Sequence, residues 1–318
     1  MTLSRALRIT VAAALTVYFL WKAEPARVAT ALARADLAWV AAAVAFVFID
    51  RALMAQRWMA LLVALAPGTK PPVSEVLRIF FVSTFIGSFM PSVGGDVYRA
   101  YSLSRLHVSG AQAAASVFMD RMLGILSIVI VGAVAALGLG RQVMQSGAIV
   151  ALAAGSAASA LVAAVVFSER LAARAQAYVG RLPSAGVRRV GLNLLDAVRR
   201  YAHHRDALAT VLLTSIVVQA LRVLQAWCLG RSLGLPTPLI LYFVFIPVIL
   251  LVMLLPITIN GLGTGQMAFE ALFGSAGISG AESFALSVLF IALGFVGNLP
   301  GGLLYAFGAR RHAEEITR

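Results

Sequence analysis

An apolar stretch, FFVSTFIGSFM at residues 80–90, stops abruptly at PSVGG (91–95) and resumes as DVYRAY (96–101). A similar break follows a second long apolar stretch, where residues 256–265 read PITINGLGTG. Proline and paired glycines do not continue a helix. In a bilayer, irregular backbone persists only where it is buried in protein or lines a wet cavity. Two such breaks in corresponding halves of a chain therefore indicate a transport site.

The composition is that of an integral membrane protein. Of the 318 residues, 61% are hydrophobic and 12% are charged, whereas a soluble domain has about 25% charged residues. The apolar segments fall at about 7–21, 37–56, 76–90, 112–138, 147–167, 207–229, 238–255 and 281–307. They occupy nearly all of the chain, so we expect no soluble catalytic domain and predict that the protein is not an enzyme.

The net charge of +13 favours a membrane surface over nucleic acid as the partner, because the arginines lie at the ends of apolar segments. Cytoplasmic retention and anionic lipid headgroups account for arginines in that position. The histidines form no HExxH motif, and no GxxxxGK[ST] loop is present. We therefore predict no metal site, no nucleotide and no other cofactor.

The longest polar connection, residues 168–206, carries eight arginines and reads as an amphipathic helix on the membrane surface. The positive-inside rule places this basic linker in the cytoplasm. That placement requires segment 76–106 to enter and leave the membrane on the cytoplasmic side, as a re-entrant hairpin. Segment 238–275 is predicted to do the same from the opposite side. We predict an all-α membrane domain over residues 1–318, with about six spanning helices and two re-entrant hairpins.

An internal repeat agrees with this topology. VSGAQ at residues 108–112 is followed 170 residues later by ISGAE at 278–282, each after one of the two breaks. We interpret the chain as two halves of opposite orientation, about 37–167 and 207–307, joined by the basic linker.

The first break places charged residues at a helix start. Gly94 and Gly95 leave backbone N–H groups free there, and Asp96, Arg99 and Tyr101 follow. A helix N-terminus attracts anions, and arginine offers two parallel donors to a phosphate. We predict an anionic headgroup site at this position. The alternative is a structural turn in which Asp96 caps the helix itself.

Ionisable residues in membrane segments are costly to bury, so each is a candidate functional residue. The other candidate substrate-binding residues are Asp120, Arg121, Arg222, Asn260, Gly261, Gly263 and Glu270. Arg222 lies between Gln219 and Gln225 at a spacing of three, so one helix face carries all three and must contact protein or water. Glu270 is a candidate partner of Arg222. The alternative to substrate binding is that these charges form structural ion pairs. The same alternative applies to the adjacent residues Asp50 and Arg51.

Three motifs carry a resemblance to a known family: FMPSVGGDVYRAY at residues 89–101, DRMLG at 120–124 and LPITINGLG at 255–263. They resemble the lysylphosphatidylglycerol synthase transmembrane-region family over roughly 37–307. The family includes the flippase half of the bacterial multiple peptide resistance factor and many stand-alone proteins of about this length. The third motif is usually followed by Arg-Glu in the family, whereas this chain has Thr-Gly-Gln at 264–266.

The resemblance implies that the protein moves a phospho- or aminoacyl-lipid between leaflets of the bacterial inner membrane. It implies that a phosphate would meet Arg99 and the amides of Gly94 and Gly95, and that Asp96 or Glu270 would suit a cationic headgroup. Lipid lysylation is not implied, because the soluble transferase domain is absent. Two alternatives stay open: a carrier for polyprenyl phosphate or its sugar conjugate, and a non-transporting scaffold. Each would serve a glycosyltransferase or other lipid-modifying enzyme.

Overall fold

The computed structural model describes residues 25–65, 72–90, 94–106, 108–139, 146–255 and 261–316. These residues form helices joined by short connections, with no strand among them, so the all-α prediction is confirmed for the described part of the chain. The predicted span at 7–21 lies outside the described residues, as do residues 91–93 of the first break and 256–260 of the second. A short helix, α2 (Pro25–Ala33), precedes the bundle.

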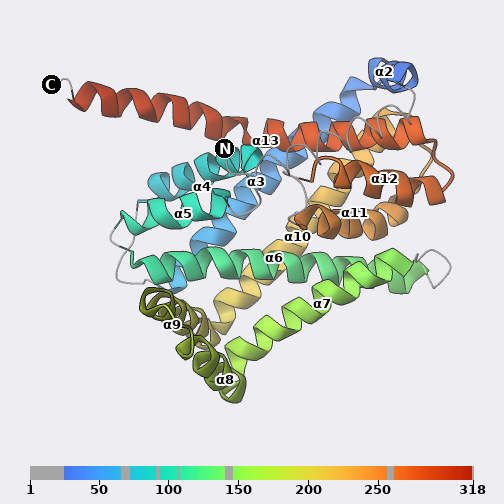
Figure 1. Cartoon of the computed structure of the whole chain (residues 1–318). Coiled ribbons are helices and arrows are strands. Elements are labelled where there is room, and N and C mark those ends of the chain that lie inside the picture. Colours follow the sequence, from blue (N-terminus) through green and yellow to red (C-terminus); the bar gives the residue numbers. More distant parts are fainter. Residues whose placement is uncertain are drawn as a thin grey trace.

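Four described helices are long and apolar enough to cross a membrane: α3 (Leu37–Leu65), α6 (Gly110–Leu139), α10 (Arg205–Ser232) and α13 (Gly280–Ile316). A fifth span is possible where α7 (Ser146–Phe167) bends by 96° into α8 (Glu169–Gly180). Figure 1 shows α3 and α10 running side by side diagonally through the bundle, with α13 crossing them near the top of the view and α6 crossing them lower down. The described chain thus forms a multi-pass helical membrane protein with four or five spans.

Each predicted break is flanked by two antiparallel helices. In the first pair, α4 (Val73–Phe89) packs on α5 (Gly94–Ser104) so that Gly87 faces Gly95. In the second, α11 (Leu239–Leu254) packs on α12 (Thr264–Ser275), with the Phe245 and Phe273 rings 5.2 Å apart. The chain therefore reverses direction across each break and forms two helical hairpins.

Glycine sets the spacing within the first hairpin. A Cβ built on Gly95 would lie 2.6 Å from the carbonyl oxygen of Ser83, closer than any real side chain is found. The absence of a side chain at Gly95 therefore allows α5 to lie directly against α4, and the polar side chains that follow on α5 are brought into the bundle.

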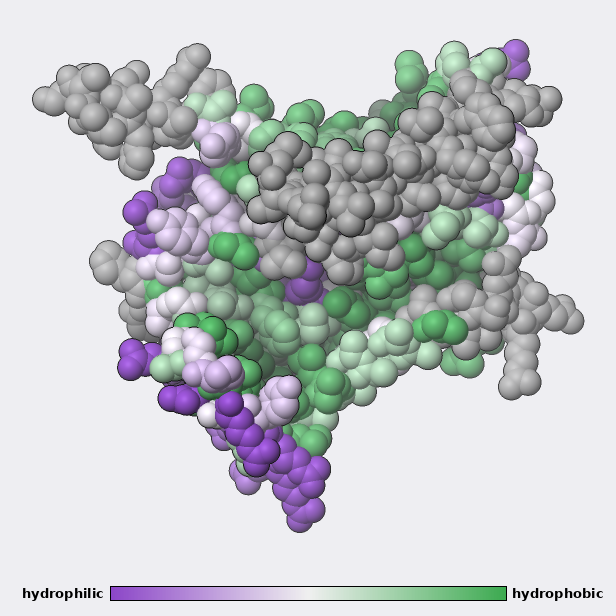
Figure 2. All heavy atoms as spheres, in the orientation of Figure 1, coloured by the Kyte–Doolittle hydropathy of each residue, from purple (hydrophilic) through white to green (hydrophobic). Residues whose placement is uncertain are grey.

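The basic linker differs from the single helix that we expected. It forms two helices, α8 and α9 (Ala185–Arg200), and a short 3-10 turn, η2 (Tyr201–His203). Pro183 causes the division, because the residue before a proline disfavours helical backbone. The Ser184 hydroxyl then accepts a hydrogen bond from the Val187 amide and starts α9. Figure 2 shows hydrophilic residues gathered at this end, next to the apolar surface of α6 and α7.

A buried tyrosine anchors the end of the basic linker to the bundle. The Tyr201 hydroxyl donates a 2.9 Å hydrogen bond to the Leu61 carbonyl of α3, and the ring is fully buried. Burial raises the pKa of the Tyr201 phenol well above its ordinary value, so the hydroxyl keeps its proton and remains a donor.

The closest approach of α13 to α4 supplies a test of the packing. A Cβ on Gly301 would lie 1.9 Å from the carbonyl oxygen of Phe81, so the two helices must separate to admit one. We expect Gly301→Ala to destabilise the protein by about 1–3 kcal/mol or more. Thermal unfolding in detergent measures the effect. Gly294→Ala, on the same helix with no atom within 4 Å of its Cβ, is the control, and equal unfolding temperatures for the two variants would refute this packing.

Candidate functional site

A polar cavity lies at the centre of the bundle and consists of two chambers. The large chamber, about 330 Å³, is lined by residues of α3, α4, α5, α6, α10, α11 and α13. The small chamber, about 240 Å³, is lined by residues of α3, α6, α10, α11 and α13. Arg51, Arg222 and Met253 line both chambers, so the two form one central cavity.

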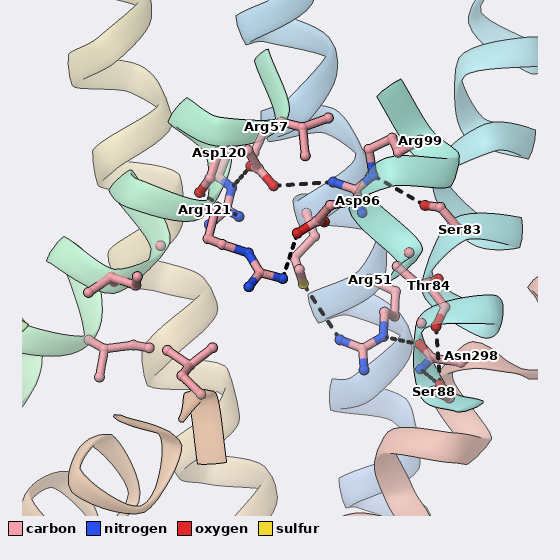
Figure 3. Close-up of a pocket in the computed structure, with 18 of the residues that line it drawn as sticks. Arg51, Arg57, Ser83, Thr84, Ser88, Asp96, Arg99, Asp120, Arg121 and Asn298 are labelled. Atoms are coloured by element: carbon pink, nitrogen blue, oxygen red, sulfur yellow. Dashed lines mark hydrogen bonds and ion pairs between the residues drawn. The ribbon is translucent and has the colours of Figure 1, made fainter. Parts of the chain in front are cut away.

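Asp120 on α6 joins two arginines from distant parts of the chain. Its Oδ1 accepts a hydrogen bond from Arg57 Nε of α3 at 2.7 Å, and its Oδ2 lies 3.4 Å from Arg99 Nη1 of α5. Arg57 also donates to Ser215 Oγ of α10 at 2.9 Å. Because all three charged side chains are buried, this cluster ties α3, α5, α6 and α10 together (Figure 3).

Further contacts fix the position of Arg99. Its Nε donates to Ser83 Oγ at 3.2 Å, and its guanidinium lies 5.0 Å from the Trp58 ring and 4.8 Å from the Phe80 ring. A guanidinium over aromatic faces gains cation–π attraction that increases when water is excluded. These contacts give Arg99 a structural role in the cluster, and its role as a phosphate ligand stays a prediction.

A second ion pair lies nearer the surface. Arg121 Nη2 of α6 lies 2.6 Å from Asp96 Oδ2 of α5, and about a third of the Arg121 side chain is exposed. Asp96 and Arg121 both line the large chamber, so their ion pair forms part of its wall. This pair is more accessible than the Arg57–Asp120–Arg99 cluster, so its arginine is better placed to meet an incoming anion.

A third charged group connects the two chambers. Asp50 Oδ2 accepts a 2.7 Å hydrogen bond from Arg51 Nη1, and Asp50 Oδ1 lies 3.3 Å from Arg222 Nε. Arg51 Nε donates to Asn298 Oδ1 of α13 at 3.0 Å, and Asn298 in turn donates to Ser88 Oγ of α4 at 2.8 Å (Figure 3). A polar chain therefore runs from the tip of the first hairpin across α13 to α3 and α10.

The polar stripe predicted on α10 faces this cavity. Gln219 lines the large chamber, Gln225 lines the small one and Arg222 lines both. The prediction that the stripe contacts protein or water is therefore confirmed. Arg222 contacts Asp50 rather than the suggested Glu270, which lies on α12 and does not line either chamber.

The structure brings together about half of the predicted site residues. Those that line the cavity are Gly95, Asp96, Arg99, Asp120, Arg121 and Arg222. Tyr101 does not: it is 58% exposed and lies in a separate groove, with its ring 5.4 Å from the Arg105 guanidinium. Tyr101 follows Arg99 by only two residues, which turns it to the outer face of α5.

The predicted glycines shape the turns. Gly94 packs against Met90 at the first hairpin tip. Gly261 and Gly263 have φ of 73° and 84°, the left-handed region that favours glycine. The Gln266 side chain accepts a hydrogen bond from the Gly263 amide and caps α12, a polar role for one of the residues that replace the family's Arg-Glu. Asn260 lies outside the described residues.

The cavity carries an excess of positive charge. Five arginines line the described walls of its two chambers, at positions 51, 57, 99, 121 and 222. Three aspartates do so, at positions 50, 96 and 120. Two positive charges are therefore uncompensated by these carboxylates. Such a cavity suits an anionic group.

The fold and this charged cavity define a helical membrane protein with a polar site inside its bundle. The family described as the lysylphosphatidylglycerol synthase TM region matches residues 5–301, and the chain belongs to that family. The predicted resemblance is thereby confirmed and extends over nearly the whole chain. No curated protein matches it.

Proposed function

We propose that the protein moves lipids with a polar headgroup between the leaflets of the bacterial inner membrane. The observation that supports this best is the central cavity, where eight charged side chains line the middle of a spanning helical bundle. Charged groups inside a membrane protein are costly to bury and mark pathways for polar substrates. The volume of the large chamber is near the lower limit for small-molecule sites, about 300 Å³. That volume suits a headgroup whose acyl tails stay in lipid.

The two hairpins fit this role as re-entrant elements. In our proposal, the α4–α5 and α11–α12 hairpins enter from opposite sides, and the basic linker is cytoplasmic with its arginines at anionic headgroups. Gly124 and Gly294, which the repeat aligns at an offset of 170, line the large and small chambers respectively. Both halves thus contribute to the lining of the cavity, which supports their interpretation as inverted repeats.

Headgroup exchange in proteoliposomes tests the proposal. The lipids carry a label on one acyl chain, and a membrane-impermeant reductant added outside quenches the label in the outer leaflet. Labelled lipids of the inner leaflet should become accessible to the reductant faster than in empty liposomes, with no nucleotide added. An imposed pH or voltage gradient forms a second arm. If exchange equals that of empty liposomes for every lipid and gradient, the protein is instead a scaffold for a lipid-modifying enzyme or glycosyltransferase.

A pair of matched variants separates the cavity from the surface. Arg121→Gln removes the more accessible cavity arginine, and we expect exchange to slow about 10- to 150-fold, as for loss of one charged hydrogen bond of about 1.5–3 kcal/mol. Arg78→Gln breaks a surface pair with Glu75, in which the arginine side chain is half exposed, and should leave exchange unchanged. Equal rates for both variants would argue against passage through the cavity.

A further inference from the structure

A second groove lies at the open end of the first hairpin, where α4 begins and α5 ends. Its volume is about 620 Å³, and α4 forms its floor between α5 on one side and α13 on the other. Helix α4 turns Ser83 and Thr84 to the central cavity but Ile79 and Val82 to the groove. Among the described residues, none that lines the groove lines either chamber of the cavity. The groove is therefore a separate site, outside the path proposed for transport.

The walls of the groove carry three tyrosines. Tyr98 and Tyr101 come from α5, and Tyr305 comes from α13. The close contact of Gly301 with Phe81 holds α13 against α4, so that Tyr305, one turn later, lies beside the groove. Tyr101 and Tyr305 are more than half exposed. Tyrosine is enriched where a membrane meets water, because its ring is apolar and its hydroxyl is polar. These walls therefore suit a ligand at the level of the lipid headgroups.

The groove carries one positive charge that its own acid does not balance. Arg78 lies 2.9 Å from Glu75, so these two charges cancel each other at the edge of the groove. For Arg105 the described residues supply no acidic partner, and its guanidinium lies 5.4 Å from the centre of the Tyr101 ring. An exposed guanidinium offers parallel donors that fit phosphate oxygens. The lining therefore fits a ligand with one negatively charged phosphate.

The open end of the hairpin lies at a membrane surface. Glu75 and Arg78 fall within the first six residues of α4, whereas residues 79–90 carry no charge. Met119 of α6, the helix that follows α5, packs in one apolar cluster with Tyr201 at the end of the basic linker. Figure 1 shows α9 beside the end of α6 that is nearest to this end of the hairpin, and Figure 2 shows hydrophilic residues over the same end of α4 and α5. The groove and the basic linker thus face the same membrane surface.

We propose that the groove binds one anionic phospholipid from the leaflet next to the basic linker, and that this lipid stays bound and braces α5 against α13. Its phosphate meets Arg105, and its acyl chains cover Leu106 and Leu304. A free phosphate leaves these apolar side chains in water, so a lipid is the occupant that uses the whole groove. The inference goes beyond the proposed function, because this lipid is a fixed component and not the transported one.

Native mass spectrometry of the full chain in a non-ionic detergent measures this binding without any transport. The probes are phosphatidylglycerol and phosphatidylcholine with the same acyl chains, which differ in the net charge of the headgroup. We expect Arg105→Gln to weaken the binding of phosphatidylglycerol about fivefold, the usual effect of one arginine at an anionic membrane surface. Phosphatidylcholine binding should change less, because its ammonium group balances the phosphate. Since Arg105 lines the groove and not the central cavity, the loss reports on the groove alone.

A control variant and a second readout locate the effect. Arg34 is also exposed but lines neither the groove nor the cavity, so Arg34→Gln should leave phosphatidylglycerol binding unchanged. A ligand of the folded state raises the unfolding temperature. Phosphatidylglycerol should therefore stabilise the wild type and Arg34→Gln protein more than Arg105→Gln protein. Without lipid, the three proteins should unfold at the same temperature, because both arginines are exposed.

Equal phosphatidylglycerol affinities for the wild type and Arg105→Gln protein would overturn the inference. Displacement of the lipid by equimolar glycerol 3-phosphate would also overturn it, because the headgroup alone would then suffice. A co-purified polypeptide that Arg105→Gln releases, with no lipid released, would mean that the groove binds a protein instead. The proposed function fails separately: a lipid held by Arg105 without headgroup exchange in liposomes refutes transport and retains the groove site.

Discussion

Replacing Asp120 by alanine is expected to destabilise the protein by about 3–5 kcal/mol, the usual cost of removing one partner of a buried ion pair. The substitution leaves the guanidinium groups of Arg57 and Arg99, which are 5% and 6% exposed, without the carboxylate that both of them contact. Those arginines come from α3 and α5, so the loss affects helices far apart in the sequence. The effect should therefore appear as unfolding of the whole bundle.

Unfolding by heat in a mild detergent, followed by tryptophan fluorescence, measures this effect. Glu75→Ala is the matched control, because it also removes an acidic partner of an arginine, in a surface pair whose acid is 39% exposed. Exposed pairs contribute about 0–1 kcal/mol. Similar unfolding temperatures for the two variants would mean that the Asp120 cluster does not hold the bundle together.

A bulky adduct in the large chamber is expected to lower headgroup exchange to the rate of empty liposomes. Thr84 on α4 is a suitable position, because it lines the chamber and is half-buried. Its hydroxyl donates to the Phe81 carbonyl of its own helix at 2.8 Å, so Thr84→Cys removes no contact between helices. A charged thiol adduct fills much of a chamber of about 330 Å³ and adds a desolvation cost to any headgroup that enters.

The membrane class, the helix breaks and the α10 stripe could be predicted because their signals are local in the sequence. Proline and glycine end a helix wherever it lies, and three polar residues at a spacing of three share one helix face whatever its partner. Pro183 was an equally local signal: it divides the basic linker into α8 and α9, whereas the apolar periodicity of that segment suggested one helix.

The pairing of charges could not be predicted, because it depends on which helices meet. Adjacent acids and arginines suggest pairs between neighbours, and Asp50 with Arg51 follows that pattern. Asp120 instead pairs with Arg57, 63 residues away. Arg51 reaches Asn298 across 247 residues.

Several cavity residues were missing from the predicted site: Asp50, Arg51, Arg57, Ser83, Ser88, Gln219, Gln225 and Asn298. Asn298 had a recognisable signal, as an amide in the apolar segment 281–307. Ser83 and Ser88 had none, since serine is common in membrane helices and can bond to its own backbone, as both do here.

The measurement that tests passage through the cavity most directly is headgroup exchange by Thr84→Cys protein before and after modification by a charged thiol reagent. The single native cysteine, Cys228, is buried and is replaced by alanine in this background. Asn193→Cys, at an exposed position on α9, accepts the same reagent outside the cavity and serves as control. The predicted result is that modification abolishes exchange at position 84 and leaves it unchanged at position 193. Exchange that continues at its full rate after complete modification at position 84 would contradict passage through this cavity.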